Sequence, residues 1–570
     1  MINSSDIRTN DSLTCLVGQG NLSKDSELLR VEDLCVAFRR EKKPDKVVVN
    51  HISFSVKEGE VLGIAGESGS GKSMTALAVM GLLPESAQCS CETIQFAGQK
   101  LLGGNATGKE RKKEKKEEEA LRRKLSGNEM AMIFQEPLTS LNPVLTIKTQ
   151  MEEPLLLHTS LNEEEREQAV LDALAKAELK NGEQLLDRYP HQLSGGMRQR
   201  VMIAMAMINK PRLLICDEPT TALDAVTERE IVDLIRRLAK ENHTAVLFIS
   251  HDLSVLRELC DRVMIMRDGI VVEEGTVAQI FEKPERNYTK RLMAAAVKGP
   301  KEAVRKASEM ENETMLLADR VSVIYRERRG LFSKVKEKRA VKQVSFAVQK
   351  GEIFGIVGES GCGKSTLLKV LSGLFEAQEG SVSVQGKPLW GGEKKTRGAE
   401  RKRTGIQMVF QDPYTSLNPA KKVGWILEEP LRLNTTLTEE ERKERVARIL
   451  EETELPEDAA NRYVAELSGG QRQRVAIAAA LITKPELVLL DEPVSALDVT
   501  VQAQILELLL RLQKEHHLTY VFVSHDMAVV RKICDRVMVM KDGKVIECGE
   551  TEELFLNPKE EYTRKLLGRK

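Results

Sequence analysis

Two glycine-rich stretches of the sequence, residues 66–73 and 358–365, combine residue types that bind phosphate. They read GESGSGKS and GESGCGKS, and an apolar segment at residues 61–65 precedes the first. Helix-forming residues follow it, which predicts a turn between a strand and a helix. Glycines in such a turn let backbone N–H groups converge on phosphate oxygens, and the helix N-terminus adds a partial positive charge. Lys72 then supplies a full charge to the β- and γ-phosphates, and the Ser73 hydroxyl can ligate Mg²⁺.

Acidic residues follow two short apolar segments that each predict a buried strand. Asp217 and Glu218 come directly after one segment, and Asp491 and Glu492 come after the other. The aspartate at such a strand end can hold Mg²⁺ through water, because this ion prefers hard oxygen ligands. The glutamate next to it can polarise the attacking water as a general base.

Histidines and glutamines complete the set of candidate chemical groups. His251 and His525 follow strand ends and can contact a γ-phosphate, and Gln135 and Gln411 can ligate Mg²⁺ and sense nucleotide. Taken alone, each of these would be an ordinary structural or surface residue. Their recurring order with the other motifs makes the functional interpretation the stronger one. The predicted catalytic residues are Glu218, His251, Glu492 and His525. The predicted Mg²⁺ ligands are Ser73, Gln135, Asp217, Ser365, Gln411 and Asp491.

Length, charge and composition bound the class of protein. A chain of 570 residues is too long for one core, and its 86 basic and 86 acidic residues leave no global field to attract nucleic acid. No apolar run is long enough to cross a bilayer, and the polar N-terminus lacks a signal-peptide core. We therefore expect a cytoplasmic protein that works at a membrane only through partners. The nine cysteines lack metal-binding spacing, and we interpret them as reduced thiols, mostly in the core.

The order of motifs in the first half recurs in the second half. Four motifs lie at nearly the same distance along the chain from their counterparts in the other half: the glutamine, the LSGG sequence, the Asp-Glu pair and the histidine. The two phosphate-loop lysines are separated by a longer stretch. The first copy is therefore the longer one between its lysine and its glutamine. The charged run at residues 103–124 lies in that interval and accounts for the difference. We interpret it as a solvated loop or an exposed helix, because acidic residues are interleaved with the basic ones.

This repeat sets the expected domain organisation. Strands alternate with helices in both copies, which predicts mostly parallel α/β cores. We predict a flexible tail at residues 1–26, a first domain at residues 27–298, a linker at residues 299–314 and a second domain at residues 315–570.

Six motifs, present twice in one order, resemble those of tandem ABC-type ATPases. They are the phosphate-binding loop, the glutamine, LSGG, the Asp-Glu pair, an aspartate-containing D-loop and the switch histidine, and they cover nearly the whole chain beyond residue 27. The resemblance implies an α/β fold with two tandem P-loop NTPase domains. Each would have a RecA-like core, an antiparallel β subdomain and a helical signature subdomain, with ATP and Mg²⁺ as cofactors.

The resemblance also implies that each ATP site is shared between the two copies. The LSGG serine and glycines of one copy would close over the nucleotide of the other, and Asp224 and Asp498 would lie on loops that cross between them. Phe38 and Tyr325 would stack on adenine. Met197 replaces Gln471 in the first copy, but because the serine and glycines remain we expect two hydrolytic sites. The implied nucleotide-binding residues are Phe38, Gly66, Glu67, Ser68, Gly69, Ser70, Gly71, Lys72, Ser73, Ser194, Gly195, Gly196, Tyr325, Gly358, Glu359, Ser360, Gly361, Cys362, Gly363, Lys364, Ser365, Thr366, Ser468, Gly469, Gly470 and Gln471.

Two further segments resemble the peptide/nickel importer branch of ABC ATPases. EPLTSLNP and DPYTSLNP follow the two glutamines, and NYTKRL and EYTRKL lie near the two domain ends. This resemblance implies a peripheral protein at the cytoplasmic face of the cell membrane. Its partners would be two membrane-spanning permease subunits, whose coupling helices dock near the SLNP segments, and an extracytoplasmic substrate-binding protein. Small peptides are the expected cargo, and nickel or a chelated metal is the alternative. Because no cysteine lies between Cys260 and Cys362, we expect no iron–sulfur cluster.

Two rival interpretations belong to other functional classes. One is a soluble, non-transport tandem ABC ATPase that acts on ribosomes or DNA, and the other is an ATP-binding module without turnover. The short linker, the neutral charge and the SLNP segments disfavour the first. The intact glutamates disfavour the second.

Overall fold

The computed structural model describes residues 27–39, 45–103, 108–135, 140–221, 223–297, 313–327, 336–390, 405–495 and 497–568. The predicted tail at residues 1–26 and most of the predicted linker lie outside this range. Thr314, the last residue of that linker, already belongs to a strand.

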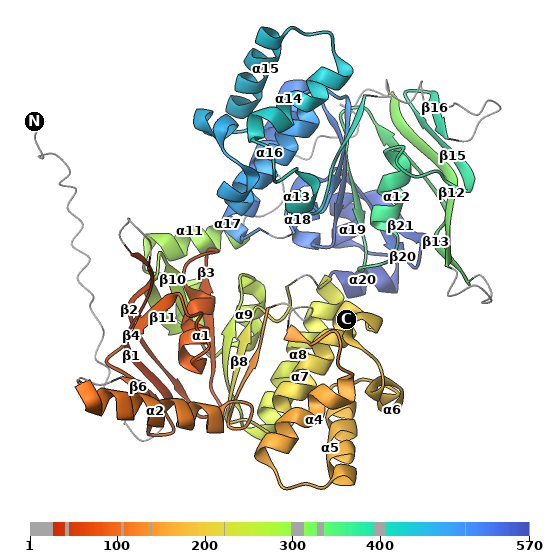
Figure 1. Cartoon of the computed structure of the whole chain (residues 1–570). Coiled ribbons are helices and arrows are strands. Elements are labelled where there is room, and N and C mark those ends of the chain that lie inside the picture. The colour runs from red at the N-terminus through yellow and green to blue at the C-terminus, as the bar shows by residue number, and fades with distance from the viewer. Residues whose placement is uncertain are drawn as a thin grey trace, which may run out of the picture.

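The central sheet of each half has six strands in the same order. Five neighbouring strands are parallel and the sixth joins the edge in antiparallel orientation (Figure 1). In the first half the order is β11-β10-β3-β9-β8-β7, and in the second it is β21-β20-β14-β19-β18-β17. The strands of the first half are β3 (Val61–Gly66), β7 (Met130–Ile133), β8 (Leu213–Asp217), β9 (Ala245–Ile249), β10 (Arg262–Arg267) and β11 (Ile270–Thr276). Those of the second half are β14 (Ile353–Val357), β17 (Ile406–Val409), β18 (Leu487–Asp491), β19 (Thr519–Ser524), β20 (Arg536–Lys541) and β21 (Lys544–Glu550).

A separate antiparallel sheet lies beside each central sheet. Its order is β2-β1-β5-β6 in the first half, with β4 also paired to β1, and β13-β12-β15-β16 in the second half. These strands are β1 (Glu27–Phe38), β2 (Lys46–Lys57), β4 (Ala87–Ser90), β5 (Thr93–Phe96), β6 (Gln99–Gly103), β12 (Thr314–Glu327), β13 (Lys336–Gln349), β15 (Glu379–Val384) and β16 (Lys387–Trp390).

Helices cover the central sheets and form a separate helical layer in each half. In the first half they are α1 (Lys72–Met80), α2 (Gly108–Leu125), α4 (Ile147–His158), α5 (Glu163–Lys176), α6 (Gly182–Leu186), α7 (Gly195–Met207), α8 (Ala225–Asn242), α9 (Leu253–Leu259), α10 (Val277–Glu282) and α11 (Asn287–Val297). In the second half they are α12 (Lys364–Leu371), α13 (Pro413–Ser416), α14 (Val423–Asn434), α15 (Glu439–Glu452), α16 (Gly469–Leu481), α17 (Val499–His516), α18 (Met527–Ile533), α19 (Thr551–Leu556) and α20 (Glu561–Leu566). The described residues also form short 3₁₀ turns at Pro190–Gln192, Glu457–Asn461 and Val464–Glu466.

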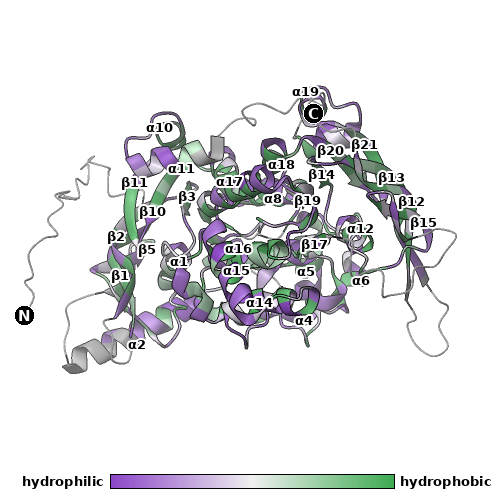
Figure 2. Ribbon diagram, turned by 90° about the horizontal axis from the view of Figure 1, so that it is seen from above, coloured by the Kyte–Doolittle hydropathy of each residue, from purple (hydrophilic) through white to green (hydrophobic). Residues whose placement is uncertain are grey.

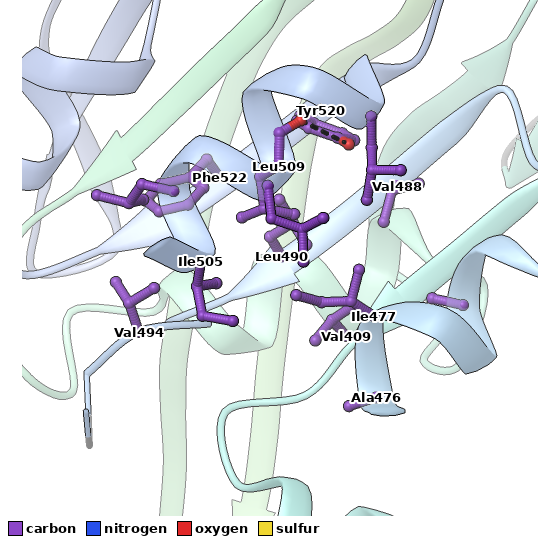
Figure 3. Packing of buried hydrophobic residues seen from close by; sticks show 14 of the residues in the cluster. Val409, Ala476, Ile477, Val488, Leu490, Val494, Ile505, Leu509, Tyr520 and Phe522 are labelled. Atoms are coloured by element: carbon purple, nitrogen blue, oxygen red, sulfur yellow. Dashed lines mark hydrogen bonds between the residues drawn. The ribbon is translucent and has the colours of Figure 1, made fainter. Parts of the chain in front are cut away.

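The central parallel strands are largely buried because one face of their sheet packs against helices and the other against the antiparallel sheet and the helix that follows the phosphate-binding loop. Every residue of β8, β9 and β18 is buried, as expected for parallel strands. Figure 3 shows how β18 and β19 pack against α16 and α17 in the second half, where the Tyr520 hydroxyl donates to the Leu509 carbonyl at 3.2 Å. Within the described residues, no helix has the length and apolar character that crossing a membrane requires.

The charged run in the first half forms a helix, α2, in the interval where the first copy is the longer one. One side of the helix is packed rather than solvated, since Glu118 and Leu125 are buried. Arg122 lies against Gly81, where an added Cβ would come within 2.6 Å of its Nη1. The interpretation as an exposed helix is therefore correct for part of its surface only.

The eight described cysteines form no disulfide bond with one another. Cys216, Cys362 and Cys534 are buried. Burial raises the pKa of the Cys216 thiol well above its ordinary value, so this side chain behaves as a small core residue.

The two halves contact each other through related helices. The last helix of each half packs against the long helix of the other, α11 against α17 and α20 against α8 (Figure 1). At the second contact, Lys565 Nζ lies 3.9 Å from Glu230 Oε1. Val226 of the first half belongs to the hydrophobic core of the second. The halves therefore face each other in a head-to-tail arrangement.

Candidate active sites

The phosphate-binding loops leave the carboxyl ends of β3 and β14, at the edge of each sheet where parallel α/β folds bind ligands. Gly66 and Gly71 have φ angles of 153° and 99°. A Cβ would lie 2.1 Å from the Met266 carbonyl at Gly66 and 2.6 Å from the Val48 carbonyl at Gly71. Only glycine therefore fits at these two points.

The lysines of these loops are held in place by the loops themselves. Lys72 is buried, and its Nζ donates to the carbonyls of Gly66 at 2.8 Å and Glu67 at 3.0 Å. Lys364 makes the corresponding bonds at 2.7 and 2.9 Å. Burial lowers the pKa of Lys72, while the neighbouring carboxylates Glu218, Asp217 and Asp498 oppose that change. A buried ammonium with only carbonyl partners is suited to bind an anion.

The predicted serine and aspartate ligands lie within hydrogen-bonding distance of each other. Ser73 Oγ donates to Asp217 Oδ1 at 2.9 Å, and Ser365 Oγ donates to Asp491 Oδ1 at 3.1 Å. Burial raises the pKa of both aspartates, so a nearby cation would help to keep them ionised. These hard oxygen donors fit Mg²⁺, which takes its remaining ligands from water and phosphate. Among the described residues, no cluster of three or more His, Cys, Asp or Glu side chains could hold a metal ion by itself.

The predicted base, histidine and glutamine converge on one carboxylate oxygen in each half. Glu218 Oε2 accepts from Gln135 Nε2 at 2.8 Å and from Thr221 Oγ1 at 3.1 Å, and lies 3.4 Å from His251 Nδ1. In the second half, Glu492 Oε2 lies 3.0 Å from both Gln411 Nε2 and His525 Nδ1. These groups come from the carboxyl ends of three adjacent parallel strands in each half.

The charge states of these pairs suit a general base. Burial raises the pKa of Glu218, but the His251 hydrogen bond and charge outweigh it, so the net pKa is lowered. The bond with Glu218 raises the pKa of His251. In the second half, burial also raises the pKa of Glu492. The hydrogen bond and charge of His525 oppose burial, and the net pKa of Glu492 is lowered. Both glutamates are therefore carboxylates at neutral pH, as acceptance of a proton from water requires.

The LSGG serines begin the helices α7 and α16. Ser194 Oγ accepts from the Met197 N–H, and Ser468 Oγ accepts from the Gln471 N–H, both at 3.3 Å. Gln471 also accepts from the Ser468 N–H at 3.1 Å, which completes a capping box in the second half. Methionine cannot make that bond. The LSGGM sequence thus keeps the serine cap but makes it weaker.

The D-loop aspartates influence the charges of the phosphate-binding loop of the opposite half. Asp498 acts electrostatically on Lys72, and Asp224 acts on Glu359. This pairing follows the same head-to-tail relation as the helix contacts between the halves.

The two predicted adenine-stacking residues differ in their surroundings. Tyr325 lies beside the start of α12, where its hydroxyl is 3.3 Å from Thr366 Oγ1 and its ring is 5.7 Å from that of Phe375. Phe38 ends β1, opposite Lys46 and Ala87. Stacking on adenine stays a prediction for both.

Two tyrosines near the phosphate-binding loops were missed as site residues. The Tyr562 hydroxyl, on α20, accepts from the Glu359 N–H at 3.2 Å, and its ring lies 4.6 Å from Lys541 Nζ. Tyr288 occupies the same position on α11, with the Arg267 guanidinium 4.9 Å from its ring. Both belong to the repeated Tyr-Thr segments, which were visible in the sequence without a structural role.

Comparison with known proteins agrees with this architecture. The ABC transporter family model matches residues 49–221 and 341–495. The peptidoglycan transport ATP-binding protein YejF of Agrobacterium fabrum (strain C58 / ATCC 33970) is 43% identical over 544 residues, covering 95% of this chain and 96% of that protein. The glutathione import ATP-binding protein GsiA of Escherichia coli (strain K12) is 42% identical over 572 residues, covering 95% and 89%. The structure of RNase-L Inhibitor covers 92% of this chain and 91% of that one at 24% identity, with a TM-score of 0.58, and shows a similar tandem fold.

The matched residues and the site geometry define a tandem ABC-type ATPase. The chain belongs to the family of ABC transporter ATP-binding proteins with two fused nucleotide-binding domains, and it hydrolyses ATP to drive import. The predicted family and the predicted enzymatic activity are confirmed.

Proposed function

We propose that this chain powers the import of small peptides, as the ATPase of a complex at the cytoplasmic face of the cell membrane. Two observations on relatives support the cargo class: one is named for peptidoglycan transport and another for glutathione import. Glutathione is a tripeptide, and peptidoglycan carries short peptides. The partners would be two permease subunits and an extracytoplasmic substrate-binding protein.

The observation that carries the proposed mechanism is the meeting of Gln, Glu and His beside each phosphate-binding loop. The glycine-rich loop and its lysine bind and orient the phosphates of ATP. The glutamate accepts a proton from the attacking water, and the histidine and glutamine hold its carboxylate in position. Mg²⁺, held by the serine hydroxyl and near the aspartate, would neutralise phosphate charge.

Closure of the two halves over ATP would transmit the binding energy to the permeases. Each site needs the LSGG serine of the opposite half, so two ATP molecules would hold the halves together. Hydrolysis then removes the bridging contacts and lets the halves reopen. The coupling segments of the permeases would dock near the SLNP segments, Ser140–Pro143 and Ser416–Pro419.

Single replacements of the bases test whether both sites are hydrolytic. Glu218→Gln and Glu492→Gln are each expected to lower turnover at their own site by about 10²- to 10⁴-fold, measured as phosphate release by the purified chain. Glu241→Gln, an exposed glutamate near the end of α8 that pairs only with Arg237 of the same helix, is the control and should keep full activity. If either base replacement left the rate unchanged, that site would be non-catalytic.

Partners and cargo are tested in cells. The tagged chain is expected to co-purify with integral membrane permeases, and recovery of ribosomal proteins in their place would contradict the proposal. A deletion strain should lose uptake of labelled di- and tripeptides. Loss of nickel or metal-chelate uptake with intact peptide uptake would favour the alternative cargo.

A further inference from the structure

Helices α4 and α14 occupy equivalent places in the two halves and begin just after the two SLNP segments. Figure 2 shows both helices along the same edge of the molecule. Three positions in and before these helices carry opposite chemistry. When the halves are aligned on Gln135 and Gln411, the first-half residues Leu145, Thr149 and Leu156 correspond to Lys421, Trp425 and Arg432.

The second-half surface is basic and pre-ordered. Trp425 is partly buried, with Lys421 Nζ and the Arg432 guanidinium each 4.7 Å from its ring. Lys422 is exposed next to them. These four residues form what we call the basic surface, and the cation–π contacts hold its two outer charges in fixed positions.

The acidic residues near the basic surface do not cancel its charge. Glu428 on α14 is already engaged by Arg442 Nε at 2.9 Å, and Glu429 is one exposed carboxylate against three exposed cations. The surface therefore presents net positive charge around an aromatic ring.

The first-half surface is apolar. Val144, Leu145 and Leu156 are exposed by 75%, 37% and 56%, and we call them the apolar surface. Leu157 and its counterpart Leu433 are exposed by 72% and 73%, so that position is apolar in both halves. Lys148, the nearest cation on α4, is already paired with Glu152 and Glu167. Exposed apolar side chains at both ends of one helix are consistent with an interaction site.

The difference between these surfaces leads us to infer that the two halves recognise different permease segments. The basic surface takes a cytoplasmic segment that carries carboxylates, and the apolar surface takes an uncharged apolar segment. This inference rests on the proposed function, in which permease segments dock near the SLNP segments. This difference would fix which permease subunit binds which half. If the acidic segment bound the apolar surface, its carboxylates would be buried without a basic partner, which costs free energy.

A protein segment fits the basic surface better than a lipid surface does. Interfacial aromatic residues insert an exposed ring among lipids. The Trp425 ring is partly buried and contacts two cations, so it is not free to insert.

Peptide binding to the full-length chain tests the inference. The probe is a fluorescein-labelled amphipathic helical peptide of leucine and glutamate. Its binding is measured by fluorescence anisotropy at low salt, and a peptide of leucine and lysine serves as the basic control. The acidic peptide is expected to bind once per chain, with Kd raised at least tenfold in Lys421→Glu/Arg432→Glu. The control Lys514→Glu/Lys544→Glu makes the same charge change on α17 and β21, away from α14 in Figure 2, and should bind normally. An equal loss in the control, or no loss in the test variant, would overturn the inference.

A variant that gains peptide binding complements this test, because binding can also be lost when a variant misfolds. Leu145→Lys/Thr149→Trp/Leu156→Arg transfers the basic surface to the first half and is expected to raise the stoichiometry of acidic peptide from one to two. Basal ATPase activity should be unchanged in every variant. Binding of phosphatidylglycerol vesicles that Lys421→Glu/Arg432→Glu abolishes would overturn the inference in favour of lipid.

Co-purification separates this inference from the proposed function. If permeases co-purify with the wild-type chain and equally with Lys421→Glu/Arg432→Glu, only the inference is wrong. If no permease co-purifies with the wild-type chain, the proposed function itself fails.

Discussion

Glu218 and Glu492 have left-handed backbone conformations, each with a φ angle of 46°. This conformation costs a non-glycine residue on the order of 1 kcal/mol. It is held because each N–H donates to a carbonyl of the next strand, Ile249 or Val523, at 3.0 Å. In this conformation each carboxylate lies beside the histidine of its own half, at 3.4 Å for Glu218 and 3.0 Å for Glu492.

The histidines should set the acid limit of activity. Burial alone raises the pKa of Glu492, and the pairing with His525 lowers it. We expect His525→Ala to raise that pKa, so the carboxylate becomes protonated at higher pH. The acid limb of the kcat/KM profile should then move to higher pH, measured in the Glu218→Gln background where only the second site turns over.

The matched control for this prediction is His516→Ala. His516 pairs with Glu452 at 3.3 Å, away from the site, and its loss should leave the profile unchanged. An unshifted acid limb in His525→Ala would show that the histidine does not set the charge state of the base. The pair also stabilises the fold: its contribution is lost as pH falls through the lowered pKa of Glu492 or rises through the raised pKa of His525.

The candidate residues Asp217, Glu218 and His251 could be picked out from the sequence because each ends or follows a strand that is recognisable by composition. Asp217, for example, ends a strand with every residue buried, and such strands appear as continuous apolar runs. The hydrogen bond from Gln135 to Glu218 and the contact of His251 with Glu218 could not be predicted this way. They depend on which strands are neighbours in the sheet, and no local pattern encodes that order.

At the scale of elements, the terminal helices α11 and α20 have two roles that no sequence pattern showed. Each places a tyrosine against the phosphate-binding loop of its own half, and each packs on the long helix of the other half. The Tyr-Thr segments were recognisable as repeated, but their contacts join residues that lie far apart in the sequence. Similarly, the charge pattern of α2 left a solvated loop and an exposed helix open and did not indicate that Glu118 is buried.

The tyrosine on α20 should affect ATP affinity. Tyr562→Phe removes the acceptor of the Glu359 N–H, a loss of about 0.5–1.5 kcal/mol. We expect the ATP KM of the second site to rise by about two- to tenfold while kcat changes little, measured in the Glu218→Gln background.

Tyr520→Phe is the control for this prediction. It also removes one tyrosine hydroxyl bond, the one to Leu509 in the core. It should lower the free energy of unfolding without changing KM. Equal KM values for Tyr562→Phe and the parent, or equal shifts in both variants, would refute the role of Tyr562.

At the scale of the whole molecule, the crossed arrangement makes a prediction about distant residues. Ser468→Arg should block hydrolysis at the Lys72 site, which lies in the other half of the sequence, while ATP still binds there. The bulky cation occupies the position that the opposite serine would take at the γ-phosphate. The measurement is phosphate release and ATP binding in the Glu492→Gln background, where only the first site turns over.

The reciprocal variant serves as the control. Ser194→Arg in the same background should leave hydrolysis at the Lys72 site intact, because that serine belongs to the other nucleotide. If Ser194→Arg blocked the Lys72 site and Ser468→Arg did not, each half would close over its own nucleotide and the crossed arrangement would be wrong.

The pairing of α11 with α17 and of α20 with α8 has a consequence for assembly. Two separate ATPase chains meet at a rate and to an extent that depend on their concentrations, and two kinds of chain can also form unproductive like pairs. Here both contact surfaces belong to one polypeptide, so each half meets its partner at a fixed effective concentration. Dilution therefore does not separate the halves, and every molecule contains one basic and one apolar surface in equal number.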